Sequence, residues 1–316
     1  MFSHFTKIPL NEIKVEALRI RKLHFGNRIT FSTPDVVSYC HNSKKKFPAI
    51  SITGSRCDLL CEHCQAKLLS FMIPAENPYK FFLILEKLRN EGALGVLVSG
   101  GADIHGKVPI EEFIPVIKSF KEKYPLFKII IHTGLINKDM AERLKEAKVD
   151  QILIDIIGDE KTINEVYHLE KRVEDYEDTL LMLKDIGHHI APHIIIGHHF
   201  GEIRGELRAL DIVTRVGVDT IVLVIYKPLI KKYNFKNPTP EEISKISAIC
   251  RILNPTIPIR MGCIRPSNSW KKDIEKGAID AGVNTIAYPL QATIEYAQEI
   301  GLETSFVQMC CSLIEP

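Results

Sequence analysis

Eight short runs of apolar, mostly β-branched residues recur along the chain, and amphipathic stretches separate them. Each run is nearly continuous in apolar residues, a pattern typical of strands that are buried on both faces. Several of the stretches between them end on Gly or Asn, as helix C-termini do. The predicted strands are Pro48–Thr53, Gly95–Gly100, Lys128–Gly134, Gln151–Ile157, Ala191–Gly197, Thr220–Tyr226, Ile257–Gly262 and Asn284–Pro289.

This alternation predicts an α/β protein with the architecture of a (β/α)8 TIM barrel. The alternative, an open doubly wound sheet, lacks the glycine-rich dinucleotide fingerprint that would follow its first strand. Besides the barrel at 47–301, we expect an N-terminal helix and lead-in at 1–46. A cysteine-containing tail at 302–316 is expected to cover the barrel mouth. A chain of 316 residues is long enough to bury a large core without disulfides.

The charge is nearly balanced, with 41 Lys and Arg against 39 Asp and Glu, and this predicts no nucleic-acid partner. Basic runs around Lys45 and Lys232 suit solvated loops or contact with an acidic partner. The segment 1–26 carries charges throughout, which is untypical of a signal peptide or a membrane span. We therefore expect a cytoplasmic protein with no membrane partner, whose eight cysteines serve metal binding or catalysis.

Three of these cysteines, Cys57, Cys61 and Cys64, form a CxxxCxxC loop directly after the first predicted strand. Barrels of this kind place their chemistry at that end of the strands. Three thiolates do not complete a structural zinc site, which takes four ligands, whereas a cubane cluster held by three cysteines keeps one iron open. The alternative is a zinc knuckle that borrows His63, but this residue lies between Cys61 and Cys64 and is poorly placed to reach the same metal.

The CxxxCxxC loop resembles the signature of the radical S-adenosylmethionine (SAM) superfamily. The resemblance implies a [4Fe–4S] cluster on Cys57, Cys61 and Cys64, with SAM bound at the open iron. An external electron donor would then drive cleavage of SAM to a 5′-deoxyadenosyl radical that abstracts hydrogen from the substrate. His63 stands where the family usually has an aromatic residue near the adenine.

Further segments resemble motifs of the same family at the ends of later strands. "SGGAD" at Ser99–Asp103 is similar to its glycine-rich motif, although a tight turn alone would also explain the two glycines. "IIIGHHFGE" at Ile194–Glu202 is similar to the segment that lines the adenine, and Asp155 stands where the family often binds ribose hydroxyls. A buried carboxylate bonded to a neighbouring loop is the alternative for Asp155. The cofactor-binding residues implied by the resemblance are His63, Gly100, Gly101, Asp103, Asp155, Gly197 and Glu202.

Within the superfamily, the order and spacing of the strands are most similar to biotin synthase and its relatives. Arg260 stands where biotin synthase has an arginine ligand to its second, [2Fe–2S] cluster. The cysteines of that cluster are replaced, by Ile130 or His132 on the third strand and by His193 on the fifth. Biotin synthase activity itself is therefore not expected, and His193 is expected to line the substrate cavity.

This chain has spare thiols of its own. Cys263 follows the seventh strand, Cys310 and Cys311 lie in the tail, and Cys40 precedes the first strand. We hypothesise that Cys40, Cys263 and one or both tail cysteines hold a second, auxiliary [4Fe–4S] cluster, with Cys311 as the catalytic candidate. Cys250 lies on the apolar face of a predicted helix and is expected to be core.

An auxiliary cluster in such a barrel supplies sulfur for insertion into an unactivated C–H bond, as in biotin synthase and lipoyl synthase. The chain resembles the two-component lipoyl synthases, which implies an octanoyl-lysine on a lipoyl carrier domain as substrate and a homologous radical SAM subunit as partner. One alternative is a single-cluster, biotin synthase-like mutase or maturase without sulfur insertion. Another is an iron–sulfur protein that serves electron transfer or cluster assembly and is no enzyme.

Overall fold

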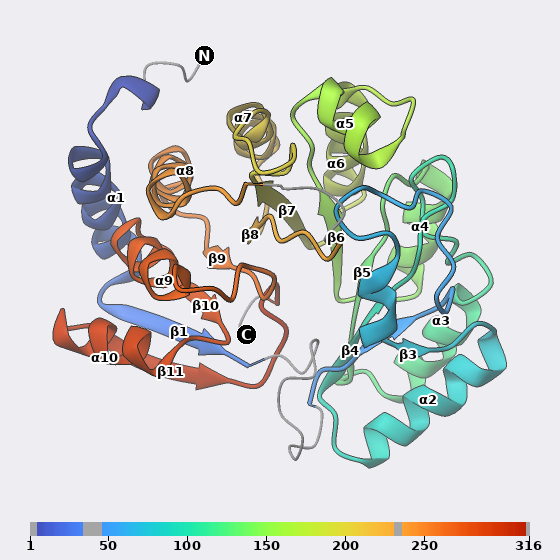
Figure 1. The fold of residues 1–316 in the computed structure, drawn as a ribbon. Coiled ribbons are helices and arrows are strands. Elements are labelled where there is room, and N and C mark those ends of the chain that lie inside the picture. Colours follow the sequence, from blue (N-terminus) through green and yellow to red (C-terminus); the bar gives the residue numbers. More distant parts are fainter. Residues whose placement is uncertain (1–4, 34–45, 231–235, 314–316) are drawn as a thin grey trace.

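The computed structural model describes residues 5–33, 46–230 and 236–313 (Figure 1). Its strands belong to one sheet in which every pairing is parallel, in the order β11-β1-β10-β9-β8-β7-β6-β5-β4-β2-β3. The strands are β1 Arg28–Ser32, β2 Ala49–Ser51, β3 Ile73–Pro74, β4 Gly95–Ser99, β5 Lys128–His132, β6 Gln151–Asp155, β7 Ile190–Ile196, β8 Ile221–Ile225, β9 Ile259–Met261, β10 Thr285–Ala287 and β11 Glu303–Val307.

Helices follow most strands and cover the outside of the curved sheet (Figure 1). Several begin where the sequence offers a cap: the Asn77 side chain accepts from Lys80 N at 2.9 Å, and Thr239 forms a capping box with Glu242. The α-helices are α1 Leu10–Phe25, α2 Pro78–Asn90, α3 Ile114–Lys123, α4 Lys138–Glu146, α5 Glu160–Tyr167, α6 Val173–Asp185, α7 Glu206–Val216, α8 Pro240–Leu253, α9 Lys271–Asp280 and α10 Gln291–Glu299; the 3-10 helices are η1 Phe5–Lys7 and η2 Lys67–Phe71. Within the described ranges, every helix is too short or too polar to cross a bilayer.

The α/β barrel-type fold is confirmed, and the eight predicted strands appear in order as β2, β4–β10. The sheet nevertheless has more strands than the eight expected from the sequence. β1 and β11 extend it beyond β10, and β3 extends it beyond β2. Figure 1 shows β1, drawn in blue, lying between β10 and β11. Parts of the segments 1–46 and 302–316 thus belong to the same sheet as the barrel strands.

Two apolar cores occupy the two faces of this sheet. The larger core packs the outward side chains of the strands against the helices. The smaller core fills the inside of the curve, where one residue from each of several strands meets the tail. Its buried members are Phe47, Ala49, Leu97, Ile130, Leu153, Ala191, Val222, Ala287, Cys310, Cys311 and Leu313. The tail therefore packs inside the barrel.

Candidate active site

The three cysteines of the CxxxCxxC loop lie after β2, at the C-terminal edge of the sheet, with Cys61 and Cys64 buried and Cys57 half-buried. Backbone hydrogen bonds fold this loop on itself, from Cys64 N to Cys61 O at 3.1 Å and from Lys67 N to Cys64 O at 2.8 Å. Ala66 adopts a φ of 60°, so the chain turns back directly after the last cysteine. Spacing and turn together bring the three thiols to one place.

The glycine-rich segment after β4 packs directly against this cysteine loop. The Thr53 hydroxyl accepts from Gly101 N at 2.7 Å and donates to Arg56 O at 2.9 Å, so one side chain joins the two segments. A Cβ on Gly101 would lie 2.0 Å from Arg56 O and 2.5 Å from the Cα of Cys57. Close approach to the cysteine loop, and not only a turn, therefore requires glycine at this position.

The thiols of the loop influence one another's ionisation. The hydrogen bond with Cys61 lowers the pKa of Cys64 to about 4, against the effect of burial. The same hydrogen bond, with burial, raises the pKa of Cys61. Thiolates are the form that binds iron or zinc. In the described parts of the chain, no three Cys, His, Asp or Glu side chains are set for a single metal ion.

Next to the cysteines, three rings form a compact group. The centroids of His63 and His198 lie 5.1 Å apart, those of Tyr167 and His198 4.9 Å, and those of His63 and Tyr167 5.4 Å. His63 Nδ1 and His198 Nε2 are buried and have no hydrogen-bond partner in the described part of the chain. Burial lowers the pKa of His198 to about 3, which keeps this imidazole neutral.

Asp155, at the end of β6, is the negative charge of the site. Its Oδ1 lies 3.3 Å from His132 Nε2, and its Oδ2 accepts from the Tyr167 hydroxyl at 3.4 Å. Burial acts to raise the pKa of Asp155, but the charge of His132 and its hydrogen bond prevail and hold it well below its usual range. Burial acts to lower the pKa of His132, yet Asp155 raises it on balance. Each group thus favours the charged form of the other.

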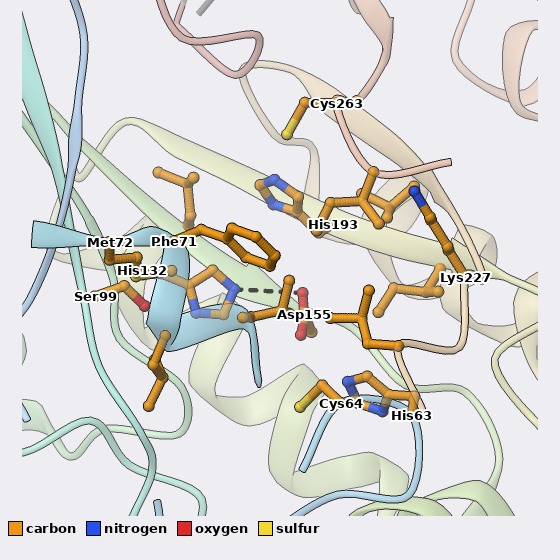
Figure 2. A pocket seen from close by; sticks show the side chains of 18 of the residues that line it. His63, Cys64, Phe71, Met72, Ser99, His132, Asp155, His193, Lys227 and Cys263 are labelled. Carbon is orange, nitrogen blue, oxygen red and sulfur yellow. Dashed lines mark hydrogen bonds and ion pairs between the residues drawn. The ribbon is translucent and has the colours of Figure 1, made fainter. Parts of the chain in front are cut away.

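These groups line a cavity of about 280 Å³ inside the strand ends, slightly below the usual ~300–1,000 Å³ of ligand pockets. Figure 2 shows His63 and Cys64 on one side of it, Cys263 and His193 on the opposite side, and the His132–Asp155 pair between them. Its remaining walls are largely aliphatic, including Leu68, Leu69, Met72, Leu97, Leu153, Ile195, Val224 and Leu229. The cavity therefore suits a ligand that is mostly apolar.

A second group of thiols, Cys263, Cys310 and Cys311, lies at that opposite side, and Cys263 and Cys311 line the cavity. The hydrogen bond with Cys311 lowers the pKa of Cys263 and, in turn, raises the pKa of Cys311 to about 12. Cys310 is turned toward Ser312, with its Sγ 3.2 Å from the Ser312 Oγ. Two of the three thiols thus face the cavity.

A buried ion pair holds the loop that carries Cys263. Arg265 and Glu275 lie 2.6 Å apart, with side chains 2% and 0% exposed. Arg265 also donates to Gly262 O at 2.8 Å, and Glu275 accepts from Leu290 N at 2.8 Å. This pair fixes the position of Cys263 relative to α9, because breaking a buried pair leaves an uncompensated charge.

A family model described as the Radical SAM superfamily matches residues 51–210, about half of the 316 residues. The chain belongs to the radical SAM superfamily. The matched region contains the cysteine loop, Gly100, Gly101 and Asp155. Membership implies a [4Fe–4S] cluster and SAM as cofactors, in agreement with the expectation from the cysteine spacing.

Among curated relatives, this radical SAM protein is similar to biotin synthase of Macrococcus caseolyticus (strain JCSC5402). The two are 24% identical over 266 residues, which cover 80% of this chain and 73% of the relative. It is also 28% identical to biotin synthase of Bacillus pumilus (strain SAFR-032) over 190 residues, covering 57% of this chain and 54% of the relative. The chain is thus biotin synthase-like at low identity.

Two solved structures share the fold. Methylornithine synthase (PylB) superposes with a TM-score of 0.60 at 13% identity, covering 96% of this chain and 92% of that one. The FeFe-hydrogenase maturase HydG from Carboxydothermus hydrogenoformans gives a TM-score of 0.65 at 16% identity, covering 96% and 74%. These similarities show the fold alone.

The residues at the cysteine loop fit the cofactors of a radical SAM enzyme. Three thiols converge there, Cys64 favours the thiolate, and a cavity opens beside them. The unpartnered nitrogens of His63 and His198 are the kind of buried polar group that a ligand satisfies. An adenine offers both a ring face and hydrogen-bonding nitrogens to such a recess.

Not every residue expected from the motifs lies at the cavity. His63, Gly100, Gly101 and Asp155 line it. Glu202 is exposed and lines neither this cavity nor the smaller one beside the cysteines. Asp103 instead accepts from His105 N at 2.9 Å and Lys107 N at 3.0 Å, so its carboxylate builds a turn.

Three other expected residues lie away from the cavity. Gly197 packs on Pro238 and has a φ of 79°. Both the close contact and the positive φ favour glycine at this position. Arg260 is buried beside Thr220, to whose Oγ1 it donates at 3.2 Å. Cys250 is buried core, as expected. Cys40 and most of the two basic runs lie outside the described residues.

Sequence reasoning missed several residues that build the site. His198 and Tyr167 join the ring group with His63. Thr53 joins the cysteine loop to the glycine-rich segment after β4. The buried Glu206 carboxylate accepts from Gly197 N at 2.7 Å. His198, the first histidine of "GHHFGE", carried a signal only as part of a motif. Tyr167 carried none, because it lies at the end of α5, far in sequence from the rings that it contacts.

Proposed function

We propose that this radical SAM protein inserts sulfur into an unactivated C–H bond of an acyl chain, as a lipoyl synthase subunit acting on octanoyl-lysine of a lipoyl carrier domain. The observation that carries the proposal is the cavity with two thiol groups. Cys57 and Cys64 line one part of it, Cys263 and Cys311 another, and aliphatic side chains lie between. An acyl chain in this space would meet both groups.

The residues of the cysteine loop would hold the SAM-binding cluster. When bound, the [4Fe–4S] cluster and SAM supply a 5′-deoxyadenosyl radical that abstracts hydrogen from substrate carbon. Cys57, Cys61 and Cys64 would be the ligands for that cluster, His63 and His198 would form the recess for the adenine, and the Asp155 carboxylate would accept from ribose hydroxyls. His132 keeps that carboxylate ionised and oriented.

The aliphatic walls serve the substrate. Each methylene buried there contributes about 0.8 kcal/mol, so an eight-carbon chain gains affinity without a polar contact. The same walls exclude water, which protects a reactive carbon radical from side reactions. Lys227 also lines the cavity, and the exposed Lys67 donates to Leu229 O at 3.3 Å beside it. These lysines suit an acidic carrier domain near the entrance.

Cys263 and Cys311 would hold the auxiliary [4Fe–4S] cluster that supplies sulfur. Both line the cavity, whereas Cys310 pairs with Ser312, so Cys311 is the better ligand of the two tail cysteines. The lowered pKa of Cys263 favours the thiolate that iron requires. The product would carry a C–S bond in place of a C–H bond.

The test compares three anaerobically reconstituted proteins: wild type, a Cys263→Ala/Cys311→Ala variant, and a Cys250→Ala control. Each is incubated with SAM, dithionite and an octanoyl-lysine peptide or octanoylated carrier domain. We expect about eight irons in wild type and the control and about four in the double variant. All three should form 5′-deoxyadenosine, and only the double variant should fail to give a sulfur-containing product.

Other outcomes would redirect the assignment. About four irons in both wild type and the double variant, with 5′-deoxyadenosine but no sulfur product from wild type, would indicate a single-cluster mutase or maturase. No 5′-deoxyadenosine from reconstituted wild type would indicate an iron–sulfur protein that is no enzyme. Addition of a homologous radical SAM subunit tests the partner, because a two-component enzyme completes its product only with both subunits.

A further inference from the structure

His193 is a polar side chain on an otherwise apolar strand face. It lies in β7, where Ala191 and Ile195 are its neighbours on the same face of the strand. Its Nδ1 lies 3.0 Å from Ala191 O. A carbonyl only accepts, so Nδ1 carries the proton and donates, and the other ring nitrogen, Nε2, keeps a lone pair. This is the arrangement by which proteins orient histidines that bind metals.

The free edge of the His193 ring faces the Cys263 side of the cavity. Figure 2 shows the Cys263 sulfur directed toward this ring, and both residues line the same cavity with Cys311. In the described part of the chain, the one hydrogen bond of His193 is that of Nδ1.

The other histidines of the cavity are arranged differently. His132 Nε2 lies against the Asp155 carboxylate at 3.3 Å, so this nitrogen is already engaged. The rings of His198 and His63 meet edge to face, and His63 lies beside Cys64 at the opposite side of the cavity. Of the four, His193 alone combines an oriented Nδ1 with an unengaged Nε2 next to the second thiol group.

We propose that His193 Nε2 is an iron ligand of the auxiliary cluster, together with Cys263 and Cys311. The inference rests on the auxiliary cluster of the proposed function and adds a ligand that is not a thiolate. Imidazole binds iron in Rieske [2Fe–2S] centres, where it raises the reduction potential. A four-iron cluster has four ligand positions around a body larger than one ion, so its ligands need not converge as tightly as those of a single metal.

The experiment isolates the auxiliary cluster in a background with Cys57, Cys61 and Cys64 changed to Ala. This background is compared with the same protein carrying His193→Cys, and with a control carrying His189→Gln, a histidine in the exposed turn before β7. All three are grown with 15N-histidine, reconstituted with iron and sulfide, and reduced with dithionite. Iron content is measured, and electron spin-echo spectroscopy detects histidine nitrogen coupled to the cluster.

We expect about four irons per chain in all three proteins. The background and the His189→Gln control should show strong 15N coupling, and the His193→Cys protein should lose it while keeping its iron. A cluster without strong histidine coupling in the background, or coupling that survives in His193→Cys, would overturn the role of His193 and leave the auxiliary cluster standing. Absence of iron in the background would overturn both this role and the auxiliary cluster.

Discussion

Two histidines of this protein, the half-buried His132 and the buried His188, have opposite protonation tendencies because their partners differ. For His132, burial favours the neutral ring, but Asp155 prevails and raises the pKa. His188 instead has a carbonyl partner, Ala141 O at 2.8 Å from its Nε2, and burial lowers its pKa. His188 lies away from the cysteine loop and the glycine-rich segment after β4. Its effect on the stability of the fold can therefore be measured separately from any effect on catalysis.

We expect His188 to make the protein less stable in mild acid. The folded pKa lies below the unfolded value of about 6.5, so the unfolded chain binds a proton that the folded chain does not. The contribution of the neutral His188 ring to the free energy of unfolding is fully present above about pH 6.5. It is lost as the pH falls toward the folded pKa, and the free energy of unfolding then decreases by at most about 1.4 kcal/mol per pH unit. Melting temperatures across this range should depend less on pH in His188→Gln than in wild type.

His189→Gln is the matched control for this measurement. His189 is the adjacent residue, its side chain is 67% exposed, and its ring lies 3.4 Å from an Asp219 oxygen. The control should keep the pH dependence of wild type. Identical curves for wild type and His188→Gln would contradict the predicted role of burial at His188.

At the scale of elements, the two adjacent glycines after β4 allow a paired test. A Cβ at Gly101 would meet backbone of the cysteine loop at 2.0 Å, whereas at Gly100 it would meet Thr53 and Ile52 side-chain atoms at 3.1–3.2 Å. Gly101→Ala should therefore displace Cys57 and lower the iron bound after reconstitution by at least half. Gly100→Ala should bind iron close to the wild-type level, and equal losses in both variants would contradict this explanation.

The elements that sequence predicted and missed differ in how much apolar surface they bury. β4–β8 carry apolar runs buried on both faces, and their periodicity made them recognisable. β11 is mostly exposed, and β3 has two residues, so neither has an apolar run to detect. β1 begins with an exposed arginine and interrupts its apolar residues with Thr30 and Ser32, and its partners lie far along the sequence.

Some features of the candidate site were also predictable from the sequence, and others were not. The cysteines were predictable because their spacing is local and few other structures need it. The contact of Thr53 with Gly101 and the ring group of Tyr167 with His63 and His198 were not, because each forms between separate loops. The proximity of Cys263 to Cys311 was expected as a hypothesis, and the structure brings these two to one cavity.

At the scale of the whole molecule, cofactor binding should be coupled to the stability of the fold. A ligand that binds only the folded state at about one hundred times its Kd adds about 2.7 kcal/mol. Saturating SAM should raise the melting temperature of the reconstituted protein by on the order of 5 °C. The variant with Cys57, Cys61 and Cys64 changed to Ala should show no such rise, and an equal rise would place SAM elsewhere.

The pairing of β1 also has a consequence for the order of folding. β2 pairs with β4, its near neighbour in sequence, so the strand that leads into the cysteine loop finds its partner early. β1 pairs only with β10 and β11, which come from the far end of the described chain. Contacts between such distant segments form slowly. Because Cys310 and Cys311 directly follow β11, we expect the first cluster site to mature before the second.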